Sequence, residues 1–592
     1  VRLSDIATVE RRYQKANKVV NYDTDNALII SVEMRKGNNI VSYGKEVNEV
    51  LDSFEEELPS SVRLHRITDQ PKVVSESVYS FLRDLVISML VVIAVMMLLF
   101  PIRTAIVASS SLPVCTAAAI ASMYFFGIEL NTVTLAALIV VLGMVVDDSI
   151  INIDGYVDNL EKGMEPFDSA VTAARTLFMP MFIATTAICA MFFPIKVLIT
   201  GPLGDFVQLF PWTILFAMAW SLIYAMLVIP GMEIRFIKSK PKDNAFTRVQ
   251  RRFFTKLQAL YDSLQALCFR HPFKTIAVGL GSIALGILMF LQLNVQMMPM
   301  AERDLFAIEM RLGEGSTVEE TTAAADSLQK MLLKDPRITA VSAFVGETAP
   351  RFHVTYAPSM PSSNLAQLIV STTSIEATEE LLPLVDSLYS YHFNNAHVRV
   401  RQMDYQACAC PIEVFVLGDD LQQTAPVARK IRDYMKTMEG DRLRLVHSSD
   451  DDVTSSIRIS PKSEQCAALG ISPLALSLTL HGDSSPITLT GIQDGYKSIP
   501  VQLYLDYGEQ NSFDNISDRL VATAFPGVSV PLREVADISP SWERSCVERR
   551  YGSRCISVSA DMKFWESQIR ASKQIRKFVD EEILPPLPEG VS

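Results

Sequence analysis

Six long apolar runs constrain this chain more than any other feature of its sequence. A helix that crosses a membrane needs roughly 20 mostly apolar residues. Six segments of the 592-residue chain meet that requirement: 83–101, 104–126, 131–153, 178–200, 209–231 and 275–293. Six buried core helices of this length in one soluble protein would be improbable. The runs therefore predict a membrane protein with several spanning helices.

The loops between the runs predict an orientation. The stretch 232–274 contains ten Lys or Arg residues, whereas the loops 127–130 and 201–208 contain none. Because positive charge is retained in the cytoplasm, 232–274 is expected inside and the two bare loops outside. Six spans then place residues 1–80 and 294–592 together on the non-cytoplasmic side. Within the inner stretch, apolar residues of 246–269 recur every three or four positions, which predicts an amphipathic helix on the membrane surface.

The regions outside the runs have the pattern of α+β domains. Four short β-rich segments alternate with helical patterns at 317–333 and 424–438. The β-rich segments are 27–34, 410–418, 498–506 and 555–562. This alternation predicts split βαβ units. The expected fold class is a membrane α-helical bundle with α+β domains on the non-cytoplasmic side.

An internal repeat relates the two ends of the chain. The segment VRLSDIATV at 1–9 corresponds to VPLREVADI at 530–538, and NALIISVEMRK at 26–36 to RCISVSADMKF at 554–564. These matches lie at one offset of about 529 residues, with a slip of one residue, and indicate a duplicated architecture. We therefore expect 530–592 to repeat 1–63, and the chain to be a segment of a longer protein that also has a first helix and a second membrane bundle.

The third apolar run carries two adjacent carboxylates, Asp147 and Asp148. An ionisable residue inside a membrane is costly and marks a functional site by default. Neighbouring helical residues point about 100° apart, so both side chains can face one space between helices. Such a pair can take up and release a proton, as a proton relay requires. The alternative is a solvated position near the inner membrane surface, and it weighs most for Asp154, which extends the polar stripe beside Gly155.

The six runs contain no central Lys or Arg, since Lys196 lies near the outer end of its run. Two carboxylates in a low-dielectric site need compensation if both ionise. A compensating cation is therefore expected on a helix beyond Ser592.

Other classes of chemistry leave no signature in the sequence. It has no G-x-x-x-x-G-K-[ST] loop, no H-E-x-x-H pair and no G-x-S-x-G elbow, so we expect no enzyme activity and no cofactor. The net charge of −12 argues against nucleic acid. The cluster of Met297, Met298 and Met300 leaves a soft-metal site open as an alternative, although no metal site is predicted.

The run from Gly143 to Ile150, with the pattern G-x-x-x-D-D-[SA]-I, resembles the fourth transmembrane helix of resistance-nodulation-division (RND) efflux pumps. The resemblance extends over the whole chain. It includes Met298-Pro299 with Glu302, the segment 313–319, the run 412–420 and the element 530–536.

The resemblance implies a homotrimeric pump of the bacterial inner membrane, of the hydrophobe/amphiphile efflux type. Such a pump exports drugs, detergents and bile-salt-like compounds, driven by the proton-motive force. It would work with a periplasmic membrane-fusion adaptor protein and an outer-membrane channel. Asp147 and Asp148 match the proton-carrying aspartates of the family. The lysine that the family's tenth helix contributes would lie outside this chain.

The resemblance also implies a division into domains. Residues 1–80 would be a porter subdomain, 81–231 family helices two to six, 232–274 the cytoplasmic amphipathic region and 275–293 family helix seven. The remaining assignments are porter subdomains at 294–445, a docking domain at 446–529 and a porter element at 530–592.

The family binds its substrates in a Phe-rich pocket of the porter subdomain that follows the seventh helix. Here Phe344, Phe352 and Tyr356 are the candidates. The strand 397–402 alternates Val with Arg399 and Arg401, which places both Arg side chains on one face. If that face lines the pocket, the pump would favour anionic or polar amphiphiles. The alternative is that the face meets solvent or another subunit.

Two other functions stay open. A metal-exporting relative, for copper or silver, would use the Met cluster at 297–300. A membrane scaffold or receptor on the same bundle would have no need for the carboxylates at 147 and 148, so the aspartate pair favours transport.

Overall fold

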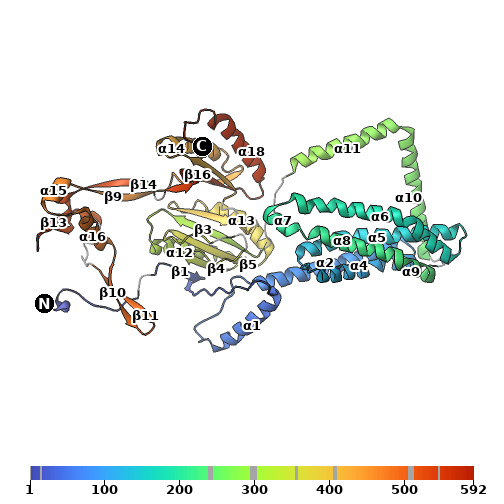
Figure 1. Ribbon diagram of the computed structural model, residues 1–592, viewed down its shortest axis with the longest axis horizontal. Coiled ribbons are helices and arrows are strands. Elements are labelled where there is room, and N and C mark those ends of the chain that lie inside the picture. Colours follow the sequence, from blue (N-terminus) through green and yellow to red (C-terminus); the bar gives the residue numbers. More distant parts are fainter. Residues whose placement is uncertain are drawn as a thin grey trace. The chain divides into compact units, whose positions relative to one another are not determined.

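The computed structural model describes residues 2–13, 16–237, 245–293, 303–353, 356, 358–403, 410–504, 513–544 and 547–592. The chain divides into two compact units. One is the helical unit, Val32–Gln292, and the other is the mixed unit, which combines Val1–Ser31 with Leu293–Ser592. Figure 1 shows helices alone in the first and sheets with covering helices in the second.

The helical unit confirms the six apolar runs. Six segments among the described residues are long and apolar enough to cross a membrane, and each overlaps one predicted run. The helices are α1 (Ile40–Glu57), α2 (Gln70–Leu99), α3 (Ile102–Ser109), α4 (Ser111–Phe125), α5 (Thr132–Glu161), α6 (Pro166–Leu198), α7 (Gly201–Val207), α8 (Phe210–Leu227), α9 (Ile229–Phe236), α10 (Ala245–Arg270) and α11 (Pro272–Gln292).

Several helices extend beyond their apolar runs, because the runs mark only the stretch suited to lipid. Helix α2 begins at Gln70, where the Asp69 side chain accepts a hydrogen bond from the backbone N–H of Lys72. Helix α6 begins at Pro166 and continues through Pro180 and Pro194. Proline inside a helix is tolerated in membrane bundles, where neighbouring helices satisfy the freed backbone groups.

Helix α5 is the centre of this unit. Its N-terminus is fixed by a capping box, in which Asn131 and Thr134 exchange side-chain and backbone hydrogen bonds. It packs against α2, α4, α6 and α8, and many of its side chains are buried in the bundle core. Any polar group on α5 is therefore held in an apolar surrounding.

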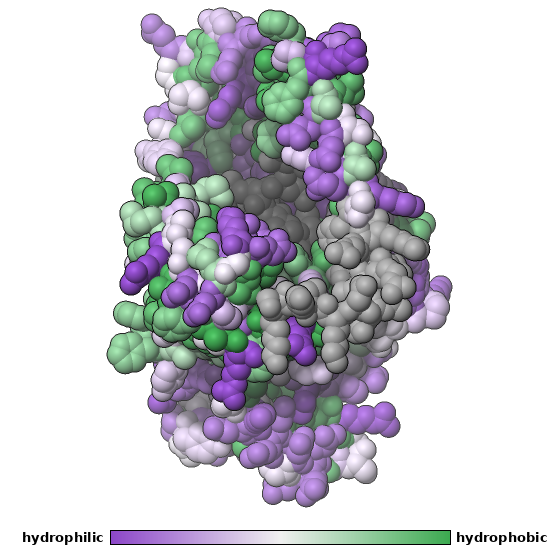
Figure 2. Space-filling view, turned by 90° about the vertical axis from the view of Figure 1, so that its right-hand side faces the viewer, coloured by the Kyte–Doolittle hydropathy of each residue, from purple (hydrophilic) through white to green (hydrophobic). Residues whose placement is uncertain are grey.

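One end of the helical unit has a mixed surface. Seen from the side that carries α9 and α10, hydrophilic side chains lie next to hydrophobic ones (Figure 2). The predicted amphipathic segment 246–269 forms a helix, α10.

The mixed unit contains a six-stranded antiparallel sheet, here called the first sheet, with strand order β2-β1-β4-β5-β3-β6. Its strands are β1 (Val19–Tyr22), β2 (Asp25–Asn26), β3 (Leu305–Leu312), β4 (Ile338–Val345), β5 (Leu365–Thr372) and β6 (Ala396–Arg401). Helix α12 (Val318–Leu332) connects β3 to β4, which flank β5, and α13 (Ile375–Tyr389) connects β5 to β6, which flank β3. Alternate strand residues such as Phe306, Ile308 and Val400 form a core with these helices.

The second sheet of this unit has the order β15-β16-β7, and β8 also pairs with β16. Its strands are β7 (Ile412–Leu417), β8 (Leu443–Ser448), β15 (Glu548–Arg550) and β16 (Ser553–Met562). Helices α14 (Leu421–Lys436) and α18 (Gln568–Phe578) contribute Ile431 and Ile575 to the core on this sheet.

A long two-stranded ribbon separates the second sheet from a small further core. Strands β9 (Val453–Pro461) and β14 (Ala536–Arg544) form the ribbon. The further core packs Cys466, Leu476 and Leu532. Its elements are α15 (Ser463–Ala468), α16 (Pro473–Ser484), β12 (Leu520–Ala522), β13 (Ser529–Pro531) and α17 (Leu532–Val535), with the hairpin β10 (Ile487–Asp494) and β11 (Lys497–Leu503) beside them.

One predicted strand is wrong. The segment 27–34 forms no strand, whereas its counterpart in the repeat is β16. The difference arises because β16 is paired with a strand on each side, β7 and β8, whereas no described strand pairs with 27–34. Leu28 and Ile30 consequently remain exposed. Strand propensity alone does not make a strand without a neighbour to accept its hydrogen bonds.

Candidate functional site

The acidic pair of α5 occupies two different environments. The Asp148 side chain is buried, with 6% of the residue exposed, and faces α8. Its Oδ2 accepts a hydrogen bond of 2.7 Å from the Ser221 hydroxyl, which also contacts the carbonyl oxygen of Val145 at 3.0 Å. Asp147, the preceding residue, is exposed within this unit. One carboxyl group of the pair therefore lies in the interior of the bundle, and the other lies at the surface of α5.

The polar stripe predicted along α5 is present on the buried side. Asn152, one turn after Asp148, is fully buried and donates a hydrogen bond from Nδ2 to the carbonyl oxygen of Ala225 in α8. Tyr156, one turn further, is also buried, and its hydroxyl lies 3.4 Å from the carbonyl oxygen of Ile237. Asp154 lies outside this stripe and is exposed.

No ion pair compensates the two aspartates within the described part of the helical unit. Neither Asp147 nor Asp148 has a Lys, Arg or His within ion-pair distance there. Lys196 instead lies 5.1 Å from the centre of the Trp212 ring. Since the unpaired charge of a buried carboxylate is costly, a neutral, protonated form of Asp148 is accessible.

The five candidate substrate-binding residues gather on one face of the first sheet, opposite α12 and α13. The strand register places Phe344 beside Gln367, Gln367 beside Glu309, and Glu309 beside Arg399. Arg401 is two residues further along β6, on the same face as predicted. Phe352 and Tyr356 lie over this row, with their ring centres 5.0 Å apart, and Tyr356 packs with Ala307 and Met403.

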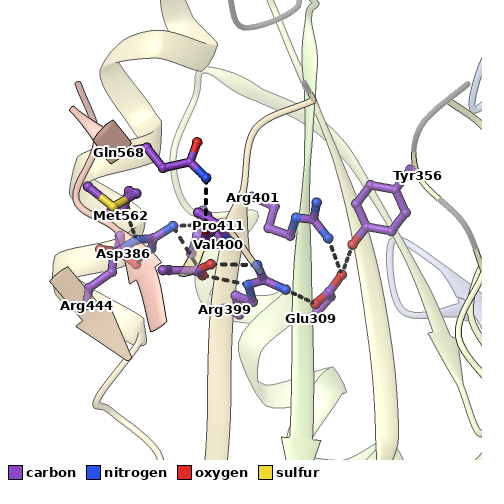
Figure 3. A network of polar contacts seen from close by, with 11 residues as sticks. Glu309, Tyr356, Asp386, Arg399, Val400, Arg401, Pro411, Arg444, Met562 and Gln568 are labelled. Atoms are coloured by element: carbon purple, nitrogen blue, oxygen red, sulfur yellow. Dashed lines mark hydrogen bonds and ion pairs between the residues drawn. The ribbon is translucent and has the colours of Figure 1, made fainter. Parts of the chain in front are cut away.

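Glu309 is hydrogen-bonded to three other residues of this face (Figure 3). Its carboxylate accepts hydrogen bonds from Arg399 at 3.3 Å, from Arg401 at 3.5 Å and from the Tyr356 hydroxyl. The Arg401 guanidinium also lies 4.7 Å from the centre of the Tyr356 ring. Burial and the charge of Glu309 together raise the pKa of the Tyr356 hydroxyl, so Tyr356 stays a neutral donor.

The same Arg side chains join the first sheet to the second. Arg399 of β6 donates two hydrogen bonds of 2.6 Å to the Asp561 carboxylate of β16. Burial opposes the charge on Arg399, but the hydrogen bonds and charge of Asp561, with that of Glu309, outweigh it and raise the pKa of the guanidinium. Arg444 of β8 pairs with Asp386 of α13 and donates to the carbonyl oxygen of Val400 at 2.7 Å. These contacts of Arg399 and Arg444 between the two sheets are here called the seam.

The positive charges of the seam are therefore matched by carboxylates. Arg399 and Arg401 are each largely buried, with 18% and 15% of their side chains exposed. The sequence pattern identified the two Arg residues but missed their acidic partners. Glu309 is the one carboxylate inside the otherwise apolar and basic strand LFAIEMRL, which is a usable signal, whereas Asp561 is 162 residues from Arg399.

One comparison with known proteins bears on this chain. The model of the AcrB/AcrD/AcrF family matches residues 1–591. The match includes both the helix that carries the aspartate pair and the two sheets joined by the seam.

The seam yields a stability prediction. Arg399→Met leaves the buried Asp561 carboxylate without its bidentate partner and is expected to destabilise the mixed unit by about 3 kcal/mol. The double variant Arg399→Met with Asp561→Leu removes both charges and should recover much of this loss. Thermal unfolding of the purified protein measures both effects. The exposed pair Arg458–Glu543 provides the control, because Arg458→Met should cost less than about 1 kcal/mol.

A double variant as unstable as the sum of its two single variants would show that Arg399 and Asp561 do not act as a pair.

Proposed function

Because this chain belongs to the AcrB/AcrD/AcrF family, we propose that it exports amphiphilic small molecules and is driven by the proton-motive force. The family consists of RND efflux transporters and not of enzymes. The chain is a membrane protein with six candidate spanning helices among its described residues.

Proton transport is assigned to Asp147 and Asp148. The observation that carries this proposal is the placement of Asp148, which is buried beside Ser221 without a described cation. A protonated Asp148 is neutral and suits the apolar core, whereas the ionised form calls for a compensating charge. Proton binding and release therefore favour two different packings around α5. Such a pair of states can be biased by a proton gradient and coupled to transport.

Substrate capture is assigned to the face of the first sheet that carries Phe344, Phe352 and Tyr356. Aromatic rings offer a large apolar contact area, and the Glu309 cluster beside them supplies polar groups. Because Arg399 and Arg401 are matched by Glu309 and Asp561, we propose that this face binds amphiphiles with little preference for negative charge.

The cellular setting follows the family. We propose a homotrimer in the bacterial inner membrane, with porter subdomains at 1–80, 294–445 and 530–592 and a docking domain at 446–529. These regions would face the periplasm and meet a membrane-fusion adaptor and an outer-membrane channel. The basic stretch 232–274, which contains α10, would lie in the cytoplasm.

Export of copper or silver gains no support from the described residues. They contain no group of three His, Cys, Asp or Glu side chains suited to hold a metal ion. The cluster of Met297, Met298 and Met300, which suggested this alternative, lies outside the described residues.

Asp147→Asn and Asp148→Asn should each abolish export, because the amide keeps the shape of the side chain but cannot release a proton. Growth of a pump-deleted Gram-negative host that expresses the full-length gene, on plates with dyes, bile salts or antibiotics, measures export. Membrane levels and trimer assembly should stay unchanged. Asp158→Asn is the matched control, since Asp158 is an exposed residue of α5 paired with Lys162. Resistance equal to wild type in both single variants would refute the assignment.

The proposed weak charge preference is tested by Arg401→Gln. This change leaves the Arg399–Asp561 pair in place and is expected to lower resistance to anionic bile salts and to cationic dyes by similar factors. Plates with copper or silver extend the same assay, and the wild-type gene should give no protection on them. A selective loss of bile-salt resistance would instead support an anion-selective pocket.

A further inference from the structure

A second buried carboxyl lies in the helical unit, apart from the aspartate pair. Glu233 of α9 has no exposed surface. Neither oxygen of its carboxyl group has a hydrogen-bond partner among the described residues. Glu233 also forms no ion pair there, although a buried carboxylate usually has one. Such a group costs folding free energy without a structural return, so a functional reason is needed.

The surroundings of Glu233 favour its neutral form. Helix α9 packs against α3, α5, α6 and α8. Apart from Asp148 and Glu233 itself, the charged side chains of these helices and of α9 lie at exposed positions. They include Arg103, Asp154, Asp158, Arg175 and Arg235. Helix α8 carries no charged residue. Two buried hydroxyls are titratable neighbours: that of Tyr156, which interacts electrostatically with Glu233, and that of Tyr224 of α8, which contacts the sulfur of Met232 beside Glu233. Burial raises the pKa of Glu233 to about 8.

A line of buried polar groups leads from Asp148 to Glu233. Asp148, Asn152 and Tyr156 are spaced four residues apart on α5, so they share one face and span roughly 12 Å along the helix axis. Ser221 contacts the first, Ala225 the second and Ile237 the third. The Oδ1 atom of Asn152 has no partner among the described residues, like both oxygens of Glu233. Unpartnered acceptors along a line of buried polar groups are where bridging water molecules can pass on a proton.

We propose that Glu233 is a proton-carrying residue that connects Asp148 to the cytoplasm along the contact of α5 with α8 and α9. This inference rests on the proposed proton-driven function. In the step, protonated Asp148 loses its proton and becomes a carboxylate, and ionised Glu233 gains that proton through the polar groups between them. Glu233 then releases the proton to the water of the cytoplasm, at the end of the bundle where 232–274 begins. One proton enters and one leaves, so charge balances over the cycle.

Glu233→Gln tests the inference in proteoliposomes of the full-length transporter, with an internal pH dye to follow proton flux. The variant should slow substrate-coupled proton flux by about a hundredfold or more, as loss of a proton-transferring group does in enzymes. In the wild type, the rate should depend on the cytoplasmic-side pH through a step near pH 8, and this step should be missing in the variant. Glu161→Gln is the matched control, because Glu161 is the exposed last residue of α5.

Stability separates a proton carrier from a structural residue. Removing an unpaired buried carboxyl should not destabilise the bundle, so Glu233→Gln and Glu233→Met should unfold at or above the wild-type temperature. Lower unfolding temperatures in both variants would overturn the proposal in favour of a structural role. Normal proton flux with an unchanged pH profile in Glu233→Gln would also overturn it.

The two proposals can fail separately. If Asp148→Asn stops transport while Glu233→Gln does not, the proton path through Glu233 is refuted and the function assigned to the aspartate pair stands. If Asp147→Asn and Asp148→Asn both transport normally, the proton-driven function itself fails.

Discussion

An unpaired carboxylate in an apolar helix bundle is costly, and the proposed proton-driven transport depends on this cost. Helix α5 is surrounded by α2, α4, α6 and α8, and Asp148 points into that packing with Ser221 as its hydrogen-bond partner. Water, which would solvate the ion elsewhere, is largely excluded. Under the proposed function, protonation of Asp148 would therefore change the preferred packing of the helix, and not only a local charge. The fully buried Glu233 places the same constraint on the contact between α5 and α9.

The buried carboxylates of the mixed unit differ from Asp148 and Glu233 in having ion-pair partners. Its carboxylates are paired: Asp561 receives two hydrogen bonds from Arg399, and Glu309 is contacted by both Arg side chains of β6. Paired charges of this kind fix the register of two surfaces more than they add stability. The seam thus gives the two sheets a defined mutual position, with the aromatic residues beside it. The described buried acids form no ion pair in the helical unit and are paired in the mixed unit, which agrees with the proposed division into a proton-sensitive part and a substrate-binding part.

The sequence predicted those features that depend on a short stretch of chain. An apolar run of membrane length identifies its helix by itself, and two adjacent aspartates stand out within such a run. The alternation in β6 likewise placed both Arg residues on one face. Features that need a distant partner were missed or wrong. Asp561, 162 residues from Arg399, could not be assigned to it, and 27–34 has strand propensity but no neighbouring strand. Glu233 was also missed, because its burial depends on how α9 packs.

We propose that protonation of buried carboxyl groups drives export, and imposed pH gradients test this proposal most directly. The full-length transporter is reconstituted in vesicles, and movement of a fluorescent amphiphile is followed under a pH gradient of either sign. We expect the substrate to move against the proton flux. The direction of substrate movement should reverse with the pH gradient, and a proton ionophore should stop the movement. Movement that continues at the same rate and in the same direction after the gradient has collapsed would contradict the account.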